Sequence, residues 1–286
     1  MAWQTSRFQI DLSQPKVMGI VNVTPDSFSD GGQHGSASAA IRHCEQIIQD
    51  GADILDIGGE SSRPGALPLS QDEELARILP VVRAAVDLGV PVSVDTYKPQ
   101  VMQVVLDLGE DIINDIWALR WQNAAQGVSA ARVIAAHPTC GVCLMHMHLE
   151  PQTMQVQPMQ GDVVPQVLSF LEQIANNLEG LGVKRTRILL DPGIGFGKSV
   201  AQNFSLLARQ SELLNAGYPL LSGWSRKSSL AGMVAHPDQG AVLTVGERLA
   251  PSLAAALLAA ERGAAVLRVH DVKETVQALR VLAAIR

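Results

Sequence analysis

Eight short apolar runs recur along this chain of 286 residues, and longer stretches with helical periodicity separate them. The runs are rich in Val and Ile, and they lie at 17–23, 54–57, 90–94, 111–116, 141–147, 188–190, 219–222 and 264–269. Runs of this length that are apolar on both faces are typical of parallel strands covered on each side. Strand–helix alternation repeated eight times predicts a closed (β/α)8 barrel of the TIM type, in preference to an open doubly wound sheet.

The stretches between the runs carry helix signals. Residues 36–50 place their apolar side chains on one side, as an amphipathic helix does. Residues 70–88 open with Ser70 and Glu73, the Ser-x-x-Glu box that satisfies free N–H groups at a helix start. Residues 254–261 are rich in Ala and Leu, which are strong helix formers.

The composition bounds the domain count and the class of partner. Hydrophobic residues make up 47% of the chain, which is ample for one large core, and this length is normal for a single α/β barrel. No linker or compositional break divides the chain, so we expect one domain over residues 1–286. The formal net charge is −6 and the basic residues form no run, so nucleic acid is not an expected partner.

Cysteine usage and hydropathy bear on the compartment. Cys140 and Cys143 form a C-x-x-C pair, a spacing seen in redox and zinc sites. Cys143 lies inside an apolar run, however, where a buried thiol behaves as a small hydrophobe. The first residues lack the apolar stretch of a signal peptide, and no apolar run reaches the length of a membrane span. We therefore expect a reduced, cytoplasmic protein that does not cross a membrane.

Polar residues stand where the predicted strands end, which is the end at which a barrel carries its chemistry. An Asp or Asn after a strand is often a turn former or a helix cap. Three such side chains at matching positions, Asp95, Asn114 and Asp191, are harder to explain as caps. Convergent carboxylate and amide groups suit a flat heterocycle with several hydrogen-bonding atoms, because each group is fixed by a rigid strand end.

Cationic residues lie at several of the same predicted strand ends. Taken alone, each of them can be explained as a solvated surface group; they are Arg63, Lys227, Arg268 and His270. Together they predict an anion pocket, since guanidinium groups match phosphate oxygens. The glycine-rich segment 193–198 lets a backbone approach a ligand closely, although it lacks the spacing of a Walker loop.

Ordered motifs at these ends resemble the dihydropteroate synthase family over about residues 18–271. The matching strings are MGIVNVTPDSFSDGG (18–32), DIGGESSRPGA (56–66), SVDTYKP (93–99), IINDI (112–116), LMHM (144–147), DPGIGFGK (191–198), SRKS (225–228) and RVHDV (268–272). Several are long and follow the family's order, so the resemblance is specific. It implies a transferase of folate biosynthesis that condenses 6-hydroxymethyl-7,8-dihydropterin pyrophosphate with p-aminobenzoate, giving 7,8-dihydropteroate and pyrophosphate.

The resemblance also implies a role for individual residues. The pterin would be bound by Asp95, Asn114, Ile116, Met145, Asp191, Phe196 and Lys227. The pyrophosphate would be bound by Asn22, Ser62, Arg63, Arg268 and His270. Asn22 would also ligate a Mg²⁺ cofactor that bridges to the pyrophosphate, and Ser222 and Lys227 would meet p-aminobenzoate, where sulfonamides would compete. Catalysis would depend on Arg63, Asp95, Asp191 and Lys227. The family further implies closure of loops 24–32 and 61–66, and a homodimer.

Two other functions share part of this pattern. A methyltransferase that uses methyltetrahydrofolate would share the barrel and the ring contacts, but it would not need the anion pocket. A pterin-binding paralogue without activity would have lost anion or loop residues, and every expected position here keeps its chemistry. One departure from the family is His148-Leu149, which stands where Gln-Gly is common. We expect it to alter the shape of the loop and not the activity.

Overall fold

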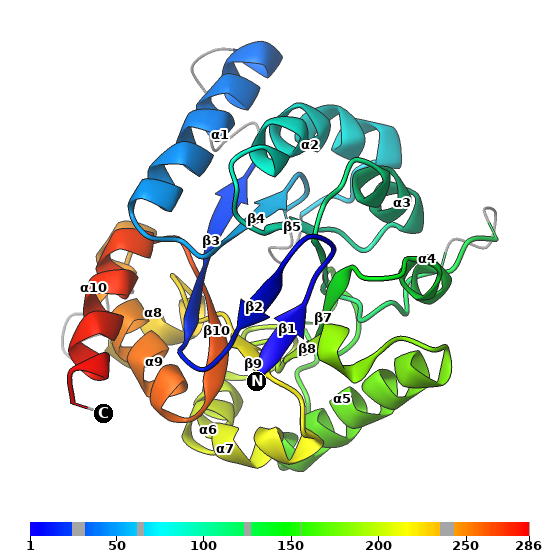
Figure 1. Ribbon diagram of the computed structural model, residues 1–286. Coiled ribbons are helices and arrows are strands. Elements are labelled where there is room, and N and C mark those ends of the chain that lie inside the picture. Colours follow the sequence, from blue (N-terminus) through cyan, green and yellow to red (C-terminus); the bar gives the residue numbers. More distant parts are fainter. Residues whose placement is uncertain (25–31, 62–65, 123–126, 155, 235–242, 286) are drawn as a thin grey trace.

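The computed structural model describes residues 1–24, 32–61, 66–122, 127–154, 156–234 and 243–285 (Figure 1). Eight parallel strands close into a barrel in the order β10-β3-β4-β5-β6-β7-β8-β9. They are β3 (Lys16–Asn22), β4 (Ile54–Gly58), β5 (Val92–Asp95), β6 (Ile112–Asp115), β7 (Gly141–Met145), β8 (Ile188–Asp191), β9 (Leu220–Ser222) and β10 (Ala264–Val269). The predicted (β/α)8 barrel is confirmed, and all eight strands begin and end within two residues of the expected positions.

Helices surround the barrel on its outside (Figure 1). They are α1 (Gly32–Gln49), α2 (Gln71–Val86), α3 (Pro99–Asp107), α4 (Ala130–Ala136), α5 (Val163–Gly180), α6 (Val200–Ala208), α7 (Gln210–Leu213), α8 (Ser228–Val234), α9 (Leu249–Glu261) and α10 (Val272–Ala283), with short 3-10 turns η2 (Arg185–Arg187), η3 (Leu214–Ala216) and η4 (Val245–Arg248). The predicted capping box at α2 is present. The Ser70 hydroxyl accepts the Glu73 N–H at 3.3 Å, and the Glu73 carboxylate accepts the Ser70 N–H at 2.9 Å.

Side chains alternate along each strand between two hydrophobic layers, because successive residues of a strand point to opposite faces. Outward residues such as Leu55 and Ile57 pack against the helices in the larger core. Inward residues near the strand starts form a second buried layer, made of Met18, Ile54, Ile112, Cys143, Leu189, Leu221 and Val266. The interior at this level is therefore packed, and Cys143 is a buried free thiol, as its apolar surroundings in the sequence predict.

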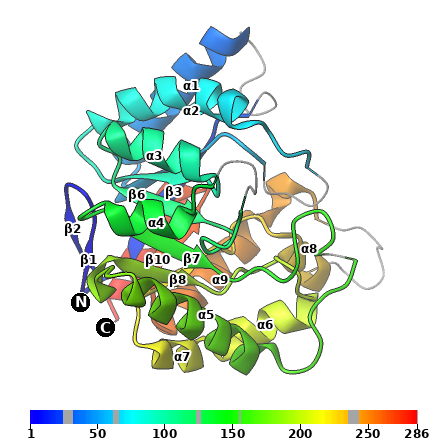
Figure 2. The ribbon, with the colours of Figure 1, turned by 90° about the vertical axis from the view of Figure 1, so that its right-hand side faces the viewer.

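A small antiparallel hairpin closes the end of the barrel at which the strands begin. It consists of β1 (Ala2–Gln4) and β2 (Gln9–Asp11), and it lies at one end of the molecule in Figure 2. Trp3 is fully buried, and its indole N–H donates to the carbonyl of Arg187 at 2.9 Å. Trp3 and Ile10 pack against the inward layer. Since this end is closed, the polar interior faces the C-terminal ends of the strands.

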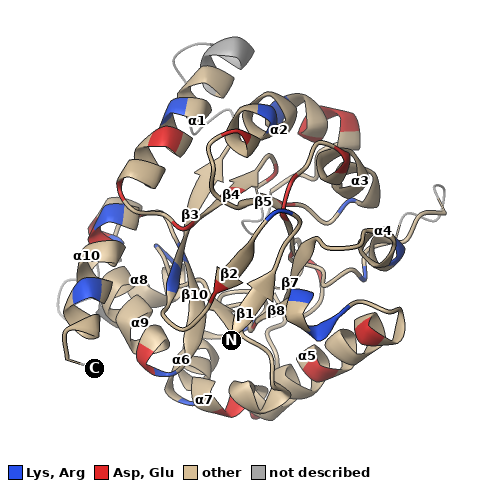
Figure 3. Ribbon diagram, in the orientation of Figure 1, with Lys and Arg blue, Asp and Glu red and all other residues tan. Residues whose placement is uncertain are grey.

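The surface carries charges of both signs. Figure 3 shows acidic and basic residues interspersed over the helices that surround the barrel. No helix among the described residues is long and apolar enough to cross a membrane.

Candidate active site

The strand register brings the predicted polar residues to one level of the barrel. Adjacent strands pair Asn22 with Gly58, Gly58 with Asp95, and Asp95 with Asn114. On the far side, Met145 pairs with Asp191. Gly58 contributes no side chain at this level, and a Cβ there would lie 3.5 Å from that of Asp95, so the glycine leaves room beside the carboxylate. The structure thus gathers the residues that the sequence places at separate strand ends.

A buried carboxylate on β4, Asp56, lies directly below this level and connects several of the predicted residues. It accepts the Ser93 hydroxyl at 2.7 Å and the Arg268 Nε–H at 2.6 Å. The Asn114 amide nitrogen donates to its two oxygens at 3.3 and 3.4 Å. Asp56 is completely buried, so a carboxylate there is tenable only with such partners. Asp56 opens one of the sequence motifs but was given no role there, although it is a charged residue within an apolar run.

Arg268 spans two carboxylates in this structure. Besides its bond to Asp56, its Nη2 donates to Asp95 at 2.8 Å. Burial raises the pKa of Asp95, and the positive charge of Arg268 opposes that rise. Arg268 therefore compensates the negative charge of a predicted pterin ligand while it is itself a predicted pyrophosphate ligand.

Asp191, Phe196 and Lys227 form the opposite side of the site. Asp191 accepts the Gly193 N–H at 2.7 Å through one carboxylate oxygen, and burial raises its pKa. The Lys227 ammonium lies 4.5 Å from the centre of the Phe196 ring, within the range of a cation–π contact. Burial lowers the pKa of Lys227 to about 8, with the charge of Arg268 as the next cause. The predicted grouping of these three residues is thus present in the structure.

An apolar wall stands beside these polar groups. Ile116, Met145 and Phe196 belong to one buried cluster, together with Met147 and Met154. Flexible thioethers and an aromatic edge suit the faces of a planar ring, while the neighbouring carboxylates and amide suit its hydrogen-bonding edge. The three residues expected at the pterin faces therefore lie together.

Lys198 organises the glycine-rich loop that carries Phe196. Its buried ammonium donates to the carbonyls of Gly193 at 2.9 Å and Phe196 at 3.1 Å, and it lies 2.9 Å from His146 Nδ1. Gly193 has a φ of 68°, and a Cβ there would lie 1.9 Å from the carbonyl oxygen of His146, so only glycine fits. Burial lowers the pKa of Lys198 to about 7. Lys198 ends one of the sequence motifs, but the sequence alone gave it no role.

Three predicted residues are not placed with this group. Ser62 and Arg63 lie outside the described residues, as do parts of the loops 24–32 and 61–66. Ser222 follows the inward residue Leu221 on β9, so its side chain points toward the helices, and its buried hydroxyl has no hydrogen-bond partner among the described residues. Its direction gives no support to the predicted contact between Ser222 and p-aminobenzoate.

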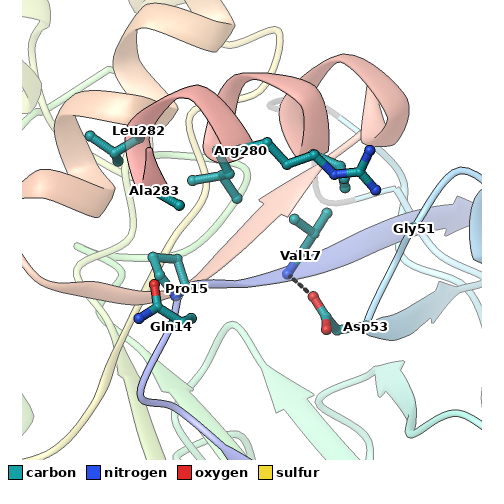
Figure 4. Close-up of a pocket in the computed structure, with 10 residues that line it drawn as sticks. Gln14, Pro15, Val17, Gly51, Asp53, Arg280, Leu282 and Ala283 are labelled. Carbon is teal, nitrogen blue, oxygen red and sulfur yellow. Dashed lines mark hydrogen bonds between the residues drawn. The ribbon is translucent and has the colours of Figure 1, made fainter. Parts of the chain in front are cut away.

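Two hollows lie at opposite ends of the barrel. One of about 800 Å³ opens beside the site, and its lining includes Glu60, Tyr97, Lys98, Ile116 and Trp117. The other, of about 280 Å³, lies between the start of β3 and α10; Figure 4 shows Pro15, Val17, Asp53 and Arg280 around it. Of the predicted site residues that the structure describes, none borders this second hollow, whereas Ile116 borders the first.

A closed parallel barrel whose strand ends converge carboxylates, an amide and cations defines a barrel enzyme with a site for a polar heterocycle and an anion. Residues 18–270 match the model of the pterin binding enzyme family. The dihydropteroate synthase of Escherichia coli (strain K12) is 49% identical over 279 residues, which cover 96% of this chain and 93% of that protein.

Solved structures agree with this match. The Xanthomonas albilineans dihydropteroate synthase with 4-aminobenzoic acid has a TM-score of 0.89 at 43% identity and covers 100% of this chain and 98% of its own. The Burkholderia cenocepacia enzyme complexed with 7,8-dihydropteroate has a TM-score of 0.86 at 46% identity, with 100% and 96% covered.

The chain belongs to the pterin binding enzymes and, within them, to the dihydropteroate synthases. It is a transferase of folate biosynthesis that condenses 6-hydroxymethyl-7,8-dihydropterin pyrophosphate with p-aminobenzoate. The resemblance, the fold and the activity predicted from the sequence are thereby confirmed, and the methyltransferase alternative is set aside.

Proposed function

We propose that the residues gathered at the strand ends carry out this condensation in one cavity. The pterin ring edge is held by Asp95, Asn114, Asp191 and Lys227, and its faces by Ile116, Met145 and Phe196. The pyrophosphate lies toward Asn22, Arg268 and His270, joined by Ser62 and Arg63 on the resemblance alone. The observation that carries the proposal is that Asp95, Asn114 and Asp191 stand at the C-terminal ends of their strands beside two partly buried cations, Arg268 and Lys227.

The chemistry follows from where charge develops. The C–O bond to pyrophosphate breaks, and the bond electrons leave with the pyrophosphate while the electron-rich dihydropterin ring stabilises the resulting cation. Asp191, as a carboxylate at the ring edge, stabilises that positive charge, and Arg268 and His270 donate hydrogen bonds to the leaving oxygens. The amine of p-aminobenzoate then attacks the cation, the C–N bond forms, and the nitrogen releases its proton to solvent water. Catalysis rests on positioning and electrostatics, without a covalent enzyme intermediate.

Arg268 links the two substrate regions in this proposal. In the structure its Nη2 is bonded to Asp95 and its Nε to Asp56. When substrate binds, Nη2 turns from Asp95 to the pyrophosphate, and the freed carboxylate of Asp95 accepts a ring N–H. Asp56 keeps Nε throughout, so the guanidinium pivots about a fixed bond.

Mg²⁺ is proposed as the cofactor. Asn22 ends β3 beside the side-chain-free Gly58 and is partly exposed, so its amide oxygen would be the protein ligand of the cation. No group of three His, Cys, Asp or Glu that could hold a metal occurs within the parts of the chain that the structure describes. A single neutral oxygen ligand fits a hard cation that takes its other ligands from phosphates and water. When bound, Mg²⁺ would neutralise charge on the leaving pyrophosphate.

The proposal also covers the second substrate and the assembly of the protein. p-Aminobenzoate approaches from the side of Lys227 and Phe196, and sulfonamides, which mimic it, compete there. The relatives whose structures contain 4-aminobenzoic acid and 7,8-dihydropteroate support small-molecule partners. We further propose a single-domain, cytoplasmic homodimer, in which helices remote from the strand ends form the interface.

Pyrophosphate release tests the proposal directly. Purified protein is given the dihydropterin pyrophosphate and Mg²⁺, with and without p-aminobenzoate. We expect release that depends on p-aminobenzoate, yields dihydropteroate and falls at least about a hundredfold in Lys227→Ala and Asp95→Ala. Lys16→Ala, at the opposite end of β3, is the matched control and should retain activity, since Lys16 pairs with Asp53 at the end of the barrel remote from the site. Tight pterin binding without product would refute the catalytic roles.

A further inference from the structure

Side-chain hydrogen bonds join the turn after β9 to the residues that follow β10. The Ser225 hydroxyl lies 3.0 Å from His270 Nδ1, and the Arg226 guanidinium Nε donates to Asp271 at 3.1 Å. Arg226 has a φ of 59°, and its N–H donates to the Ser252 hydroxyl at 2.9 Å. A non-glycine residue in this left-handed region costs roughly 1–2 kcal/mol and persists where the surroundings over-determine it. The contact between Ser225 and His270 is therefore built into a constrained turn.

The hydrogen atoms at this contact can be accounted for. The Ser225 oxygen accepts the backbone N–H of His270 at 3.1 Å, so one of its lone pairs is occupied. Ser225 is 8% exposed, and His270 Nδ1 is the only side-chain acceptor for its single hydroxyl hydrogen within the described residues. If Nδ1 carried a proton instead, the oxygen would receive two N–H donors and leave its own hydrogen buried without a partner. That arrangement costs free energy, because a buried hydroxyl hydrogen without an acceptor has lost its bond to water and gained none in return.

We propose that Ser225 is a positioning residue that fixes the imidazole of His270 in the tautomer protonated at Nε2. Ser225 donates to Nδ1, and Nε2–H becomes a donor toward the anion. This rests on the proposed role of His270 at the pyrophosphate. Among the residues that the structure describes, Nε2 has no hydrogen-bond partner, so it is available to a ligand.

The tautomer matters because the ring is neutral at working pH. Burial lowers the pKa of His270 to about 3, and the charges of Arg268 and Arg226 add to this. A neutral imidazole with its proton on Nδ1 would present a lone pair to an anionic oxygen, which is repulsive. The same ring with its proton on Nε2 presents a hydrogen-bond donor. Ser225 thus decides whether His270 attracts or repels the leaving group.

The tautomer can be measured without turnover. Long-range ¹H–¹⁵N correlation spectra of protein labelled at its 7 histidines separate protonated from unprotonated ring nitrogens, and His270→Gln assigns the signals. We expect an unprotonated Nδ1 and a protonated Nε2 in the wild type. Ser225→Ala should shift the Nδ1 signal toward a mixture of tautomers, and Ser225→Thr, which keeps the hydroxyl, should restore it. Ser252→Ala is the matched control: it loosens the same turn but should leave the His270 signals unchanged.

Inhibition by inorganic pyrophosphate supplies the functional measurement. Ser225→Ala should raise the inhibition constant roughly tenfold, the size of one lost hydrogen bond to a charged group, with the KM for p-aminobenzoate within about twofold. A wild-type ring protonated at Nδ1, or identical His270 signals in wild type and Ser225→Ala, overturns the inference. Either result leaves the proposed function intact if dihydropteroate is still formed. Conversely, a wild type that forms no product refutes the proposed function while the spectra still decide the tautomer.

Discussion

At the scale of single residues, Asp56 shows how one buried carboxylate can orient two ligand residues. Asp56 binds Arg268 through Nε and Asn114 through its side-chain amide nitrogen. Arg268 Nη2, which donates to Asp95, and the side-chain oxygen of Asn114 are left to partners other than Asp56. Asp56 is thus a positioning residue, and its replacement should disturb binding at two places that it does not itself reach.

Asp56→Asn tests this role. The substitution keeps the shape but removes the charge that compensates Arg268, and breaking a buried pair costs on the order of 3 kcal/mol. We expect a lower free energy of unfolding in urea and a fall in kcat/KM for the dihydropterin pyrophosphate. The KM for p-aminobenzoate should change much less. Ser93→Ala is the control, because it removes another bond to Asp56 while Arg268 stays paired. Equal loss in both variants would contradict the role.

The ionisation of Lys227 should set an upper pH limit for the activity. Burial lowers its pKa to about 8, so its ammonium is lost as the pH rises through about 8 in the free enzyme. Since kcat/KM reports groups of the free enzyme, kcat/KM for the dihydropterin pyrophosphate should fall above pH 8. In Lys227→Arg the positive charge persists above pH 8, so the fall in kcat/KM should disappear. The activity at pH 7 should still be lower, because a guanidinium does not reproduce the hydrogen-bonding geometry of the ammonium. If kcat/KM of the arginine variant still fell above pH 8, the titrating group would be one other than Lys227.

At the scale of elements, hydropathy determines which segments become strands, and side-chain alternation determines which residues enter the site. The predicted runs match all eight barrel strands, because a strand covered on both faces has a continuous apolar sequence. The hairpin β1–β2 was not predicted, since strands of three residues are too short to show a pattern. Side chains alternate between the two faces of a strand, so Asp56, two residues after the inward Ile54 on β4, is expected to point inward. By the same rule Ser222, which follows the inward Leu221 on β9, is expected to point outward.

A further element-scale prediction concerns Glu110, which precedes β6. Its carboxylate accepts the N–H groups of Val94 at 3.2 Å and Ile112 at 2.7 Å, and so bridges β5 and β6. Its other oxygen is buried and has no hydrogen-bond partner in the described structure. Burial raises the pKa of Glu110 well above 4.5. An acid whose folded pKa is raised lowers the stability as the pH rises above its unfolded pKa, because the folded state retains the proton longer.

Glu110→Gln removes this titration. Relative to the wild type, its free energy of unfolding should increase as the pH rises from about 4.5 to 7, by at most about 1.4 kcal/mol per pH unit. Urea unfolding of both proteins at several pH values measures the difference. Glu73→Gln is a control of opposite sign: the pKa of Glu73 is lowered by its bonds to Ser70, so the wild-type advantage should grow as the pH rises toward 4.5 and stay level above it. A pH-independent difference for Glu110 would show that it is ionised in the folded protein.

At the scale of the whole molecule, the barrel separates its packed end from its reactive end. Asp95, Asn114 and Asp191 are polar residues at the ends of apolar strands, and this contrast is the signal by which the sequence singles them out. Lys198 could not be given a role in that way, because its partners are backbone carbonyls that only the folded loop of Gly193 and Phe196 brings within reach. Likewise, the pairing of Arg268 with Asp56 joins residues from opposite ends of the chain.

This separation predicts opposite effects for two aromatic residues. Trp3 is fully buried at the packed end, so Trp3→Ala should lower the free energy of unfolding by about 3–5 kcal/mol through the cavity and the lost bond to Arg187. Its kcat/KM at 25 °C should stay within roughly twofold, because distant sites contribute almost independently. Phe196→Ala, at the reactive end, should instead lower kcat/KM strongly. Urea unfolding and steady-state kinetics on both variants measure the two effects. A large loss of activity in folded Trp3→Ala would mean that the hairpin, through the inward layer of Met18 and Ile54, also sets the geometry of the site.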